Sequence, residues 1–224
     1  MTTAEQRVAA AIDHALLRPE LMPSDVEEGC ATAARFQVGT VCCRPMDVAR
    51  CGRALAGAGV GVITVIGFPH GAHTSAIKAA EAQRALADGA VELDVVLPIG
   101  LVRAGDRPGI EADIAAVVAV ADGHLVKVIL ETGYLTHDEI VLAATAAESA
   151  GANFVKTSTG YGPRNATVED VRLLRATVSA HVQVKAAGGI RNLADALALI
   201  EAGAARLGTS STATILAGGT ATGY

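Results

Sequence analysis

Aromatic residues are scarce in this chain, which has no Trp, three Tyr and three Phe among its 224 residues. Proteins that bind single-stranded nucleic acid stack the bases on aromatic side chains, and nucleic-acid binding also requires a field of basic residues. The net charge of −5 provides no such field. We therefore expect no nucleic-acid partner, although local basic groups could still hold one phosphate.

Long apolar runs are also missing. No run approaches the roughly 18 apolar residues that a membrane-spanning helix requires. Charged residues at Glu5, Arg7 and Asp13 interrupt the N-terminal segment, which therefore lacks the apolar core of a signal peptide. We expect a cytoplasmic protein without a membrane partner.

The cysteines form no CxxC pair, and two of the four are adjacent in the sequence: Cys30, Cys42, Cys43 and Cys51. This arrangement indicates reduced thiols rather than a disulfide framework.

Short apolar runs alternate with longer helical patterns along the whole chain, of which 51% is hydrophobic. The predicted strands are residues 11–14, 38–42, 60–66, 90–96, 125–130, 153–157, 182–186 and 205–207. The predicted helices are residues 24–36, 46–55, 74–88, 109–121, 136–150, 167–178 and 193–201, with a short one after Ser210. Eight such units predict a single (β/α)₈ TIM barrel over residues 1–224. A doubly wound open sheet is the alternative, and residues 216–224, rich in Gly and small residues, suggest a flexible C-terminal tail.

Two lysines stand at the ends of neighbouring predicted strands, Lys156 on the sixth and Lys185 on the seventh. In a TIM barrel the active-site residues lie at the C-terminal ends of the strands. Two inward-pointing lysines on adjacent strands would each disfavour protonation of the other, and a neutral amine can attack a carbonyl to form a Schiff base. The alternative, about equally supported by this pattern, is that both lysines form structural ion pairs.

Acidic and basic residues also occupy the predicted fourth and fifth strands, at Glu92, Asp94, Lys127 and Glu131. Glu92 and Asp94 are two residues apart and so share one face of the strand. Asp94 is closer to the C-terminal end, which favours a role in proton transfer. A buried charge network is the simpler interpretation for Lys127 and Glu92. Asp13, near the end of the first strand, is a further candidate that could instead cap a turn.

Turns rich in Gly and hydroxyl side chains follow the last three predicted strands. The loops after strands seven and eight are the usual phosphate site of a barrel, because glycine lets backbone N–H groups approach an anion. The candidate residues are Thr157, Ser158, Gly160, Gly188, Gly189, Ser210 and Ser211. Ordinary turn chemistry would produce the same residues.

Three further features have weaker interpretations. His70 and His73 have an HxxH spacing, but no third ligand is evident, so we expect no metal. Cys42 ends the second predicted strand and could line the pocket. Tyr224 is the last residue and could reach the mouth of the barrel.

Taken together, six segments resemble the deoxyribose-phosphate aldolase family in order and spacing. They are residues 12–19 (IDHALLRP), 65–69 (VIGFP), 91–96 (VELDVV), 127–132 (KVILET), 154–160 (FVKTSTG) and 184–191 (VKAAGGIR). The last two are the most specific, and the match extends over nearly the whole chain.

The resemblance implies a TIM barrel that cleaves 2-deoxy-D-ribose 5-phosphate into D-glyceraldehyde 3-phosphate and acetaldehyde, without a metal or other cofactor. It implies that Lys156 forms the imine, that Lys185 lowers the pKa of Lys156, and that Asp94 works with Lys185 in proton transfer. Tyr224 would assist protonation of the enamine carbon. The same resemblance implies that Cys42 lies in the pocket, and the Gly and Ser turns would hold the phosphate. We also place Asp13 and Lys127 among the substrate-binding residues, and family members are commonly dimers or tetramers.

The sequence departs from the family pattern at three positions: Ala15 replaces a usual Thr, Pro98 a usual Asn, and Tyr161 a commoner Phe or Lys. These departures concern substrate positioning rather than the imine chemistry. Two other functions remain open, a sugar-phosphate isomerase or epimerase and a non-catalytic sugar-phosphate sensor.

Overall fold

The computed structural model describes residues 1–222 and forms a closed barrel of eight parallel strands in sequential order, which confirms the predicted architecture. The strands are β1 Ile12–Leu16, β2 Thr40–Cys43, β3 Gly61–Ile66, β4 Glu92–Val96, β5 Leu125–Ile129, β6 Phe154–Lys156, β7 Gln183–Ala187 and β8 Arg206–Thr209. β1 pairs with both β2 and β8, so the sheet has no free edge. The open-sheet alternative is therefore excluded.

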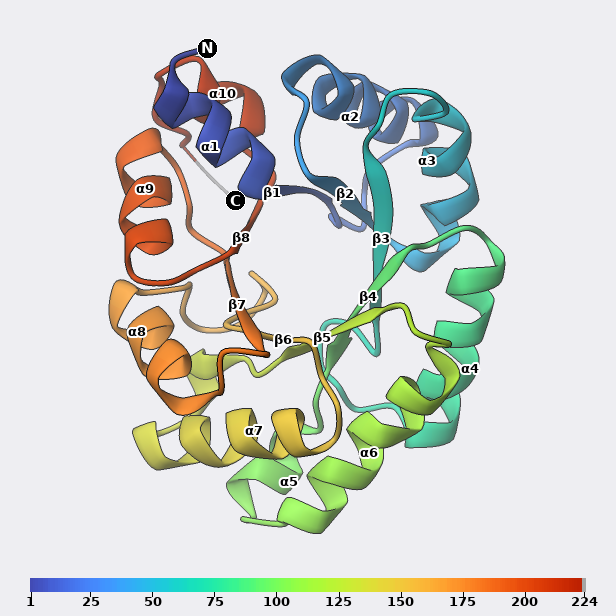
Figure 1. Ribbon diagram of the computed structural model, residues 1–224. Coiled ribbons are helices and arrows are strands. Elements are labelled where there is room, and N and C mark those ends of the chain that lie inside the picture. Colours follow the sequence, from blue (N-terminus) through green and yellow to red (C-terminus); the bar gives the residue numbers. More distant parts are fainter. Residues whose placement is uncertain (223–224) are drawn as a thin grey trace.

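Helices surround the ring of strands on all sides (Figure 1). They are α1 Thr3–Ala11, α2 Pro23–Phe36, α3 Val48–Ala54, α4 Ser75–Ala87, α5 Ile99–Arg103, α6 Arg107–Val120, α7 His137–Ser149, α8 Val168–Thr177, α9 Leu193–Glu201 and α10 Thr212–Leu216. Two 3₁₀ turns, η1 Pro45–Asp47 and η2 Thr132–Tyr134, follow β2 and β5. Within residues 1–222, no helix is both long enough and apolar enough to cross a lipid bilayer.

Two helices were not predicted. α1 precedes the barrel and starts at a capping box, in which the Thr2 hydroxyl accepts from the backbone of Glu5 and the Glu5 carboxylate accepts from that of Thr2. Because α1 extends to Ala11, β1 runs over Ile12–Leu16 rather than the predicted 11–14. α5 is a five-residue helix after Pro98, too short to show a helical period in the sequence.

Local signals explain several of the predicted helices. Thr136 and Glu139 form the reciprocal capping box at the start of α7. Gly89, Gly151 and Gly203 follow the ends of α4, α7 and α9 with positive φ angles, and each turns the chain into the next strand. Leu216, where we expected the tail to begin, is instead a buried residue of α10.

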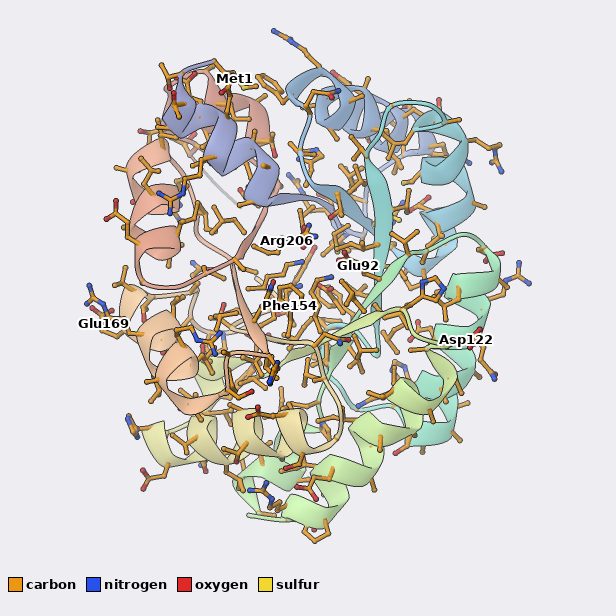
Figure 2. All side chains as sticks on the ribbon, viewed as in Figure 1. Met1, Glu92, Asp122, Phe154, Glu169 and Arg206 are labelled. Carbon is orange, nitrogen blue, oxygen red and sulfur yellow. The ribbon has the colours of Figure 1, made fainter. Side chains whose placement is uncertain are left out.

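The main apolar core lies between the barrel and the helices and consists mostly of Ala, Val, Leu and Ile side chains. A smaller inner cluster contains Leu17, Cys42, Ile63 and Val65. The remaining interior of the barrel is charged, and Figure 2 shows Glu92 and Arg206 near the centre of the ring. The same view places Asp122 and Glu169 at the outer rim.

Candidate active site

Lys156 and Lys185 occupy directly opposed positions in the register of β6 and β7. Both amines donate to the same carboxylate oxygen, Asp94 Oδ2, with Nζ–O distances of 2.9 Å for Lys156 and 2.7 Å for Lys185. All three side chains are almost completely buried. One carboxylate oxygen thus lies within hydrogen-bonding distance of two amines.

A second carboxylate, Asp13 on β1, approaches Lys185 from the other side. Its Oδ2 lies 2.5 Å from Lys185 Nζ. Its Oδ1 accepts from the Thr40 hydroxyl at 2.8 Å and from the Arg206 guanidinium at 2.9 Å. Lys185 is therefore paired with two carboxylates, whereas the ion pair of Lys156 is with Asp94 alone among the described residues.

The electrostatics of this network favour the charged forms of its carboxylates. Burial acts to raise the pKa of Asp94, but Lys127, Lys156 and Lys185 outweigh it and hold that pKa well below its usual range. The pKa of Asp13 is lowered in the same way, because Lys185 and Lys127 outweigh its burial. For Lys185, burial opposes the charge, but Asp13 and Asp94 raise its pKa above the ordinary lysine value. Lys185 is accordingly a permanent cation near neutral pH.

Lys127 lies deeper in the barrel than we expected for a substrate-binding residue. It is fully buried, contacts Glu92, and donates to Asp94 Oδ1 at 3.0 Å. It does not line the cavity at the mouth of the barrel. The structure supports the interpretation as a buried charge network, which Arg206 extends through a 3.3 Å contact with Glu92.

A cavity of about 260 Å³ opens above the Lys156–Asp94–Lys185 cluster. It brings together most of the residues that the sequence singled out: Asp13, Cys42, Lys156, Gly160, Lys185, Gly188, Gly189, Ser210 and Ser211. They come from five strands or strand ends, which explains why no single motif contains the site. Burial and the nearby Asp94 raise the pKa of Cys42 to about 11, so its thiol is protonated.

Thr157 and Ser158, predicted to contact phosphate, lie beneath the cavity wall and do not line it. Both are fully buried. The Thr157 hydroxyl accepts from Ala187 N at 3.1 Å and so ties the end of β6 to the end of β7. The Ser158 hydroxyl has no hydrogen-bond partner among the residues described.

Several cavity-lining residues were not identified as site residues from the sequence, and Asn165 and Arg191 are two of them. Asn165 comes from the loop between β6 and α8, and Arg191 follows the Gly188–Gly189 turn. The signal for Arg191 was its position two residues after the double glycine. Nothing in the sequence marked Asn165, because the loop brings it over the turn only in the folded chain.

Glu131 was grouped with the charged interior, but it supports the loop after β6 instead. It has a left-handed backbone, with φ of 54°, and its carboxylate accepts from Thr159 N at 3.2 Å and from the Thr159 hydroxyl. Burial raises its pKa against the opposing effect of these hydrogen bonds. Glu131 thereby fixes the loop that begins at Lys156.

The three departures from the family pattern lie in different places. Ala15 lines the cavity, so the missing hydroxyl faces the space for the ligand. Pro98 caps α5 and does not line that cavity. Tyr161 packs edge-on against Phe68 with 5.5 Å between ring centroids, beside a second cavity of about 230 Å³.

His70 lines this second cavity. No group of three or more His, Cys, Asp or Glu side chains among residues 1–222 is placed to hold a metal ion. Tyr224 lies outside the described residues.

Comparison with known proteins gives a consistent family. Residues 7–223 match the model of the DeoC/LacD family aldolases. The deoxyribose-phosphate aldolase of Streptococcus equi subsp. zooepidemicus is 48% identical over 212 residues, covering 95% of this chain and 96% of the relative. Deoxyribose-phosphate aldolase 2 of Staphylococcus aureus is 47% identical over 210 residues, covering 94% and 96%.

A solved structure agrees with these sequence comparisons. The deoxyribose phosphate aldolase from Aeropyrum pernix, described as having a unique tetrameric structure, superposes with a TM-score of 0.89 at 32% identity and covers 95% of this chain and 91% of its own. The extent of these matches and the barrel geometry point to one assignment. The chain belongs to the DeoC/LacD family of aldolases.

Proposed function

We propose that this aldolase cleaves 2-deoxy-D-ribose 5-phosphate into D-glyceraldehyde 3-phosphate and acetaldehyde through a Schiff base on Lys156. The observation that carries the proposal is the placement of Lys156, which lines the cavity while its amine shares Asp94 Oδ2 with the cation Lys185. We infer the substrate from the names of the relatives, which are deoxyribose-phosphate aldolases.

The charge count of the network supports Lys156 as the nucleophile. Its ion pairs join four basic side chains to three carboxylates. The carboxylates are Asp13, Glu92 and Asp94, and the basic residues are Lys127, Lys156, Lys185 and Arg206. Loss of a proton from one amine therefore leaves a balanced network, and Lys156 is the lysine that reaches the cavity with one carboxylate partner. A neutral amine is the form that attacks a carbonyl.

In the proposed reaction, Lys156 attacks the C1 aldehyde, and loss of water gives a protonated imine. Asp94 and a water molecule relay the proton away from the C3 hydroxyl, and the Lys185 ammonium holds both of them in position. The electrons of the C2–C3 bond move into the imine, which releases glyceraldehyde 3-phosphate and leaves an enamine. Protonation at C2, with assistance from Tyr224, and hydrolysis then release acetaldehyde and free Lys156. The imine serves as the electron sink, so the route uses no metal or other cofactor.

The phosphate group would bind at the turns after β6, β7 and β8. Gly160, Gly188 and Gly189 bring backbone to the cavity wall, and Ser210 and Ser211 add hydroxyl groups. Arg191 contributes a positive charge at the same wall.

Borohydride reduction in the presence of substrate tests the mechanism. We expect a stable mass adduct that peptide mapping places on Lys156, and no adduct in Lys156→Leu. An isomerase that uses Lys156 only to bind phosphate would give no adduct under turnover conditions. A non-catalytic sensor would turn over 2-deoxyribose 5-phosphate no faster than Lys156→Leu does.

We further propose that the protein is cytoplasmic. We also propose that it forms a homo-oligomer, either a dimer or a tetramer, because the Aeropyrum pernix relative is described as tetrameric. Sedimentation velocity would test the oligomeric state. A single monomeric species at micromolar concentration would overturn this part of the proposal.

A further inference from the structure

The double-glycine turn after β7 is covered by one side chain from a different loop. Gly188 and Gly189 both have left-handed backbones, with φ of 87° and 74°. A Cβ added to Gly188 would lie 2.9 Å from Asn165 Oδ1, and one added to Gly189 would lie 2.7 Å from Asn165 Cβ and 2.9 Å from Nδ2. The carboxamide of Asn165 therefore lies against both glycines.

The chain on both sides of Asn165 is held firmly. Arg164 pairs with Asp170 at the start of α8, and its guanidinium also donates to the Thr132 carbonyl at 3.1 Å. The Thr132 hydroxyl donates to Asp170 at 3.0 Å, and Thr167 caps α8. Asn165 is thus presented to the cavity by an anchored loop, which is the arrangement expected of a preorganised binding group.

Asn165 differs from its neighbours in what it offers a ligand. It lines the cavity together with Gly160, Gly188 and Arg191. An amide supplies N–H donors and no negative charge, so it suits the oxygens of an anion. A carboxylate of the same shape in this position would repel that anion.

We infer that Asn165 is a specificity-determining residue, whose carboxamide closes the phosphate compartment over Gly188 and Gly189 and selects phosphorylated over unphosphorylated sugars. The inference rests on the proposed function, because it assigns the phosphate end of the proposed substrate to this compartment. Arg191 and the glycines attract the phosphate, and Asn165 provides a neutral, donor-bearing wall where a carboxylate would exclude it.

The test compares kcat/KM for 2-deoxyribose 5-phosphate with kcat/KM for 2-deoxyribose in Asn165→Asp, which preserves the shape of the side chain and adds one charge. We expect the ratio of the two values to fall by roughly tenfold or more, mainly through KM for the phosphorylated sugar. Asn165→Ala removes the donor without adding charge, and its ratio should fall less. Asn192→Asp is the matched control, because Asn192 caps α9 and does not line the cavity. Asp also caps helices, so the ratio of the two kcat/KM values in Asn192→Asp should equal that of the wild type.

Equal losses with both sugars in Asn165→Asp would show a merely structural role and overturn the inference. An unchanged ratio would overturn it as well. If Asn165→Asp does not fold, as judged by its circular dichroism spectrum, the ratio in Asn165→Ala decides the question. The proposed function is tested separately by borohydride trapping of acetaldehyde on Lys156 in the wild type, since acetaldehyde carries no phosphate.

Discussion

Lys156 and Lys185 face each other across the β6–β7 register, and their amines share one oxygen of Asp94 at 2.9 Å and 2.7 Å. Both side chains line the cavity, but Lys185 has a second carboxylate partner, Asp13, whereas Lys156 is paired with Asp94 alone among the described residues. Two chemically identical side chains on adjacent strands therefore have different surroundings. This difference suggests different roles, a fixed cation at Lys185 and a nucleophile at Lys156.

Removal of the Lys185 charge tests this division of roles. We predict that Lys185→Leu lowers kcat near neutral pH by about 100-fold or more and moves the pH optimum upward, because Lys156 then loses the neighbouring cation that disfavours its protonation. Lys185→Arg retains a cation and should keep the optimum close to that of the wild type. The measurement is the pH–rate profile of both variants. An unchanged profile in Lys185→Leu would contradict the coupling.

Asp94, the carboxylate between the two lysines, should be as important for kcat as Lys185 is. The three neighbouring lysines hold its pKa well below the usual range, so it is ionised near neutral pH. We predict that Asp94→Asn lowers kcat by about 100-fold, because the amide cannot accept a proton from the reacting hydroxyl. Asp88→Asn, which breaks the ion pair with Arg84 outside the barrel, should leave kcat unchanged. Comparable kinetics in both variants would remove Asp94 from the mechanism.

Substitution in the double-glycine turn can separate two effects of an added Cβ, crowding against Asn165 and strain of a backbone with positive φ. Gly188→Ala combines a positive φ with a close contact to Asn165. Gly57→Ala has a similar φ of 78° but open space around the added Cβ, so it should cost only the strain, about 1 kcal/mol of unfolding free energy. We predict a raised KM for the phosphorylated sugar in Gly188→Ala alone. Steady-state kinetics and urea unfolding together separate the two effects, and equal KM values would refute the prediction.

Acid should destabilise the fold through His14. This buried ring pairs with Thr212 Oγ1 at 2.8 Å, and burial lowers its pKa from 6.5 to about 4. Between these values the unfolded chain binds more protons than the native chain, so stability falls as the pH drops from 6.5 towards 4. By pH 4 this pKa shift corresponds to a loss of about 3 kcal/mol in the free energy of unfolding. The free energy of unfolding should therefore depend less on pH in His14→Gln than in the wild type.

Urea unfolding followed by far-UV circular dichroism measures this dependence, which suits a chain without Trp. The control is His137→Gln, whose side chain is 71% exposed. Parallel pH curves for His14→Gln and the wild type would rule out His14 as the source.

The sequence alone predicted the order of strands and helices, because each strand and most helices carry local signals, and the pairing of β1 with β8 then decided for a closed barrel over an open sheet. The alternation of short apolar runs with helical patterns determined the eight βα units, and Thr136 and Gly151 marked the start and end of α7. The segments around Lys156 and Lys185 also identified the family. Helix α5 was not predicted, because five residues are too few to show a helical period in the sequence.

Only the tertiary structure decided what each charged residue contacts. Asp94, Lys156 and Lys185 lie on three strands separated by up to 91 positions in the sequence, and barrel closure brings them to one oxygen. Register also placed Lys127 below the cavity, and the loop between β6 and α8 placed Asn165 over the glycine turn, although neither position has a local signal. Residue types and strand order are properties of the chain, but the depth of a side chain within the barrel depends on how the strands are staggered around it.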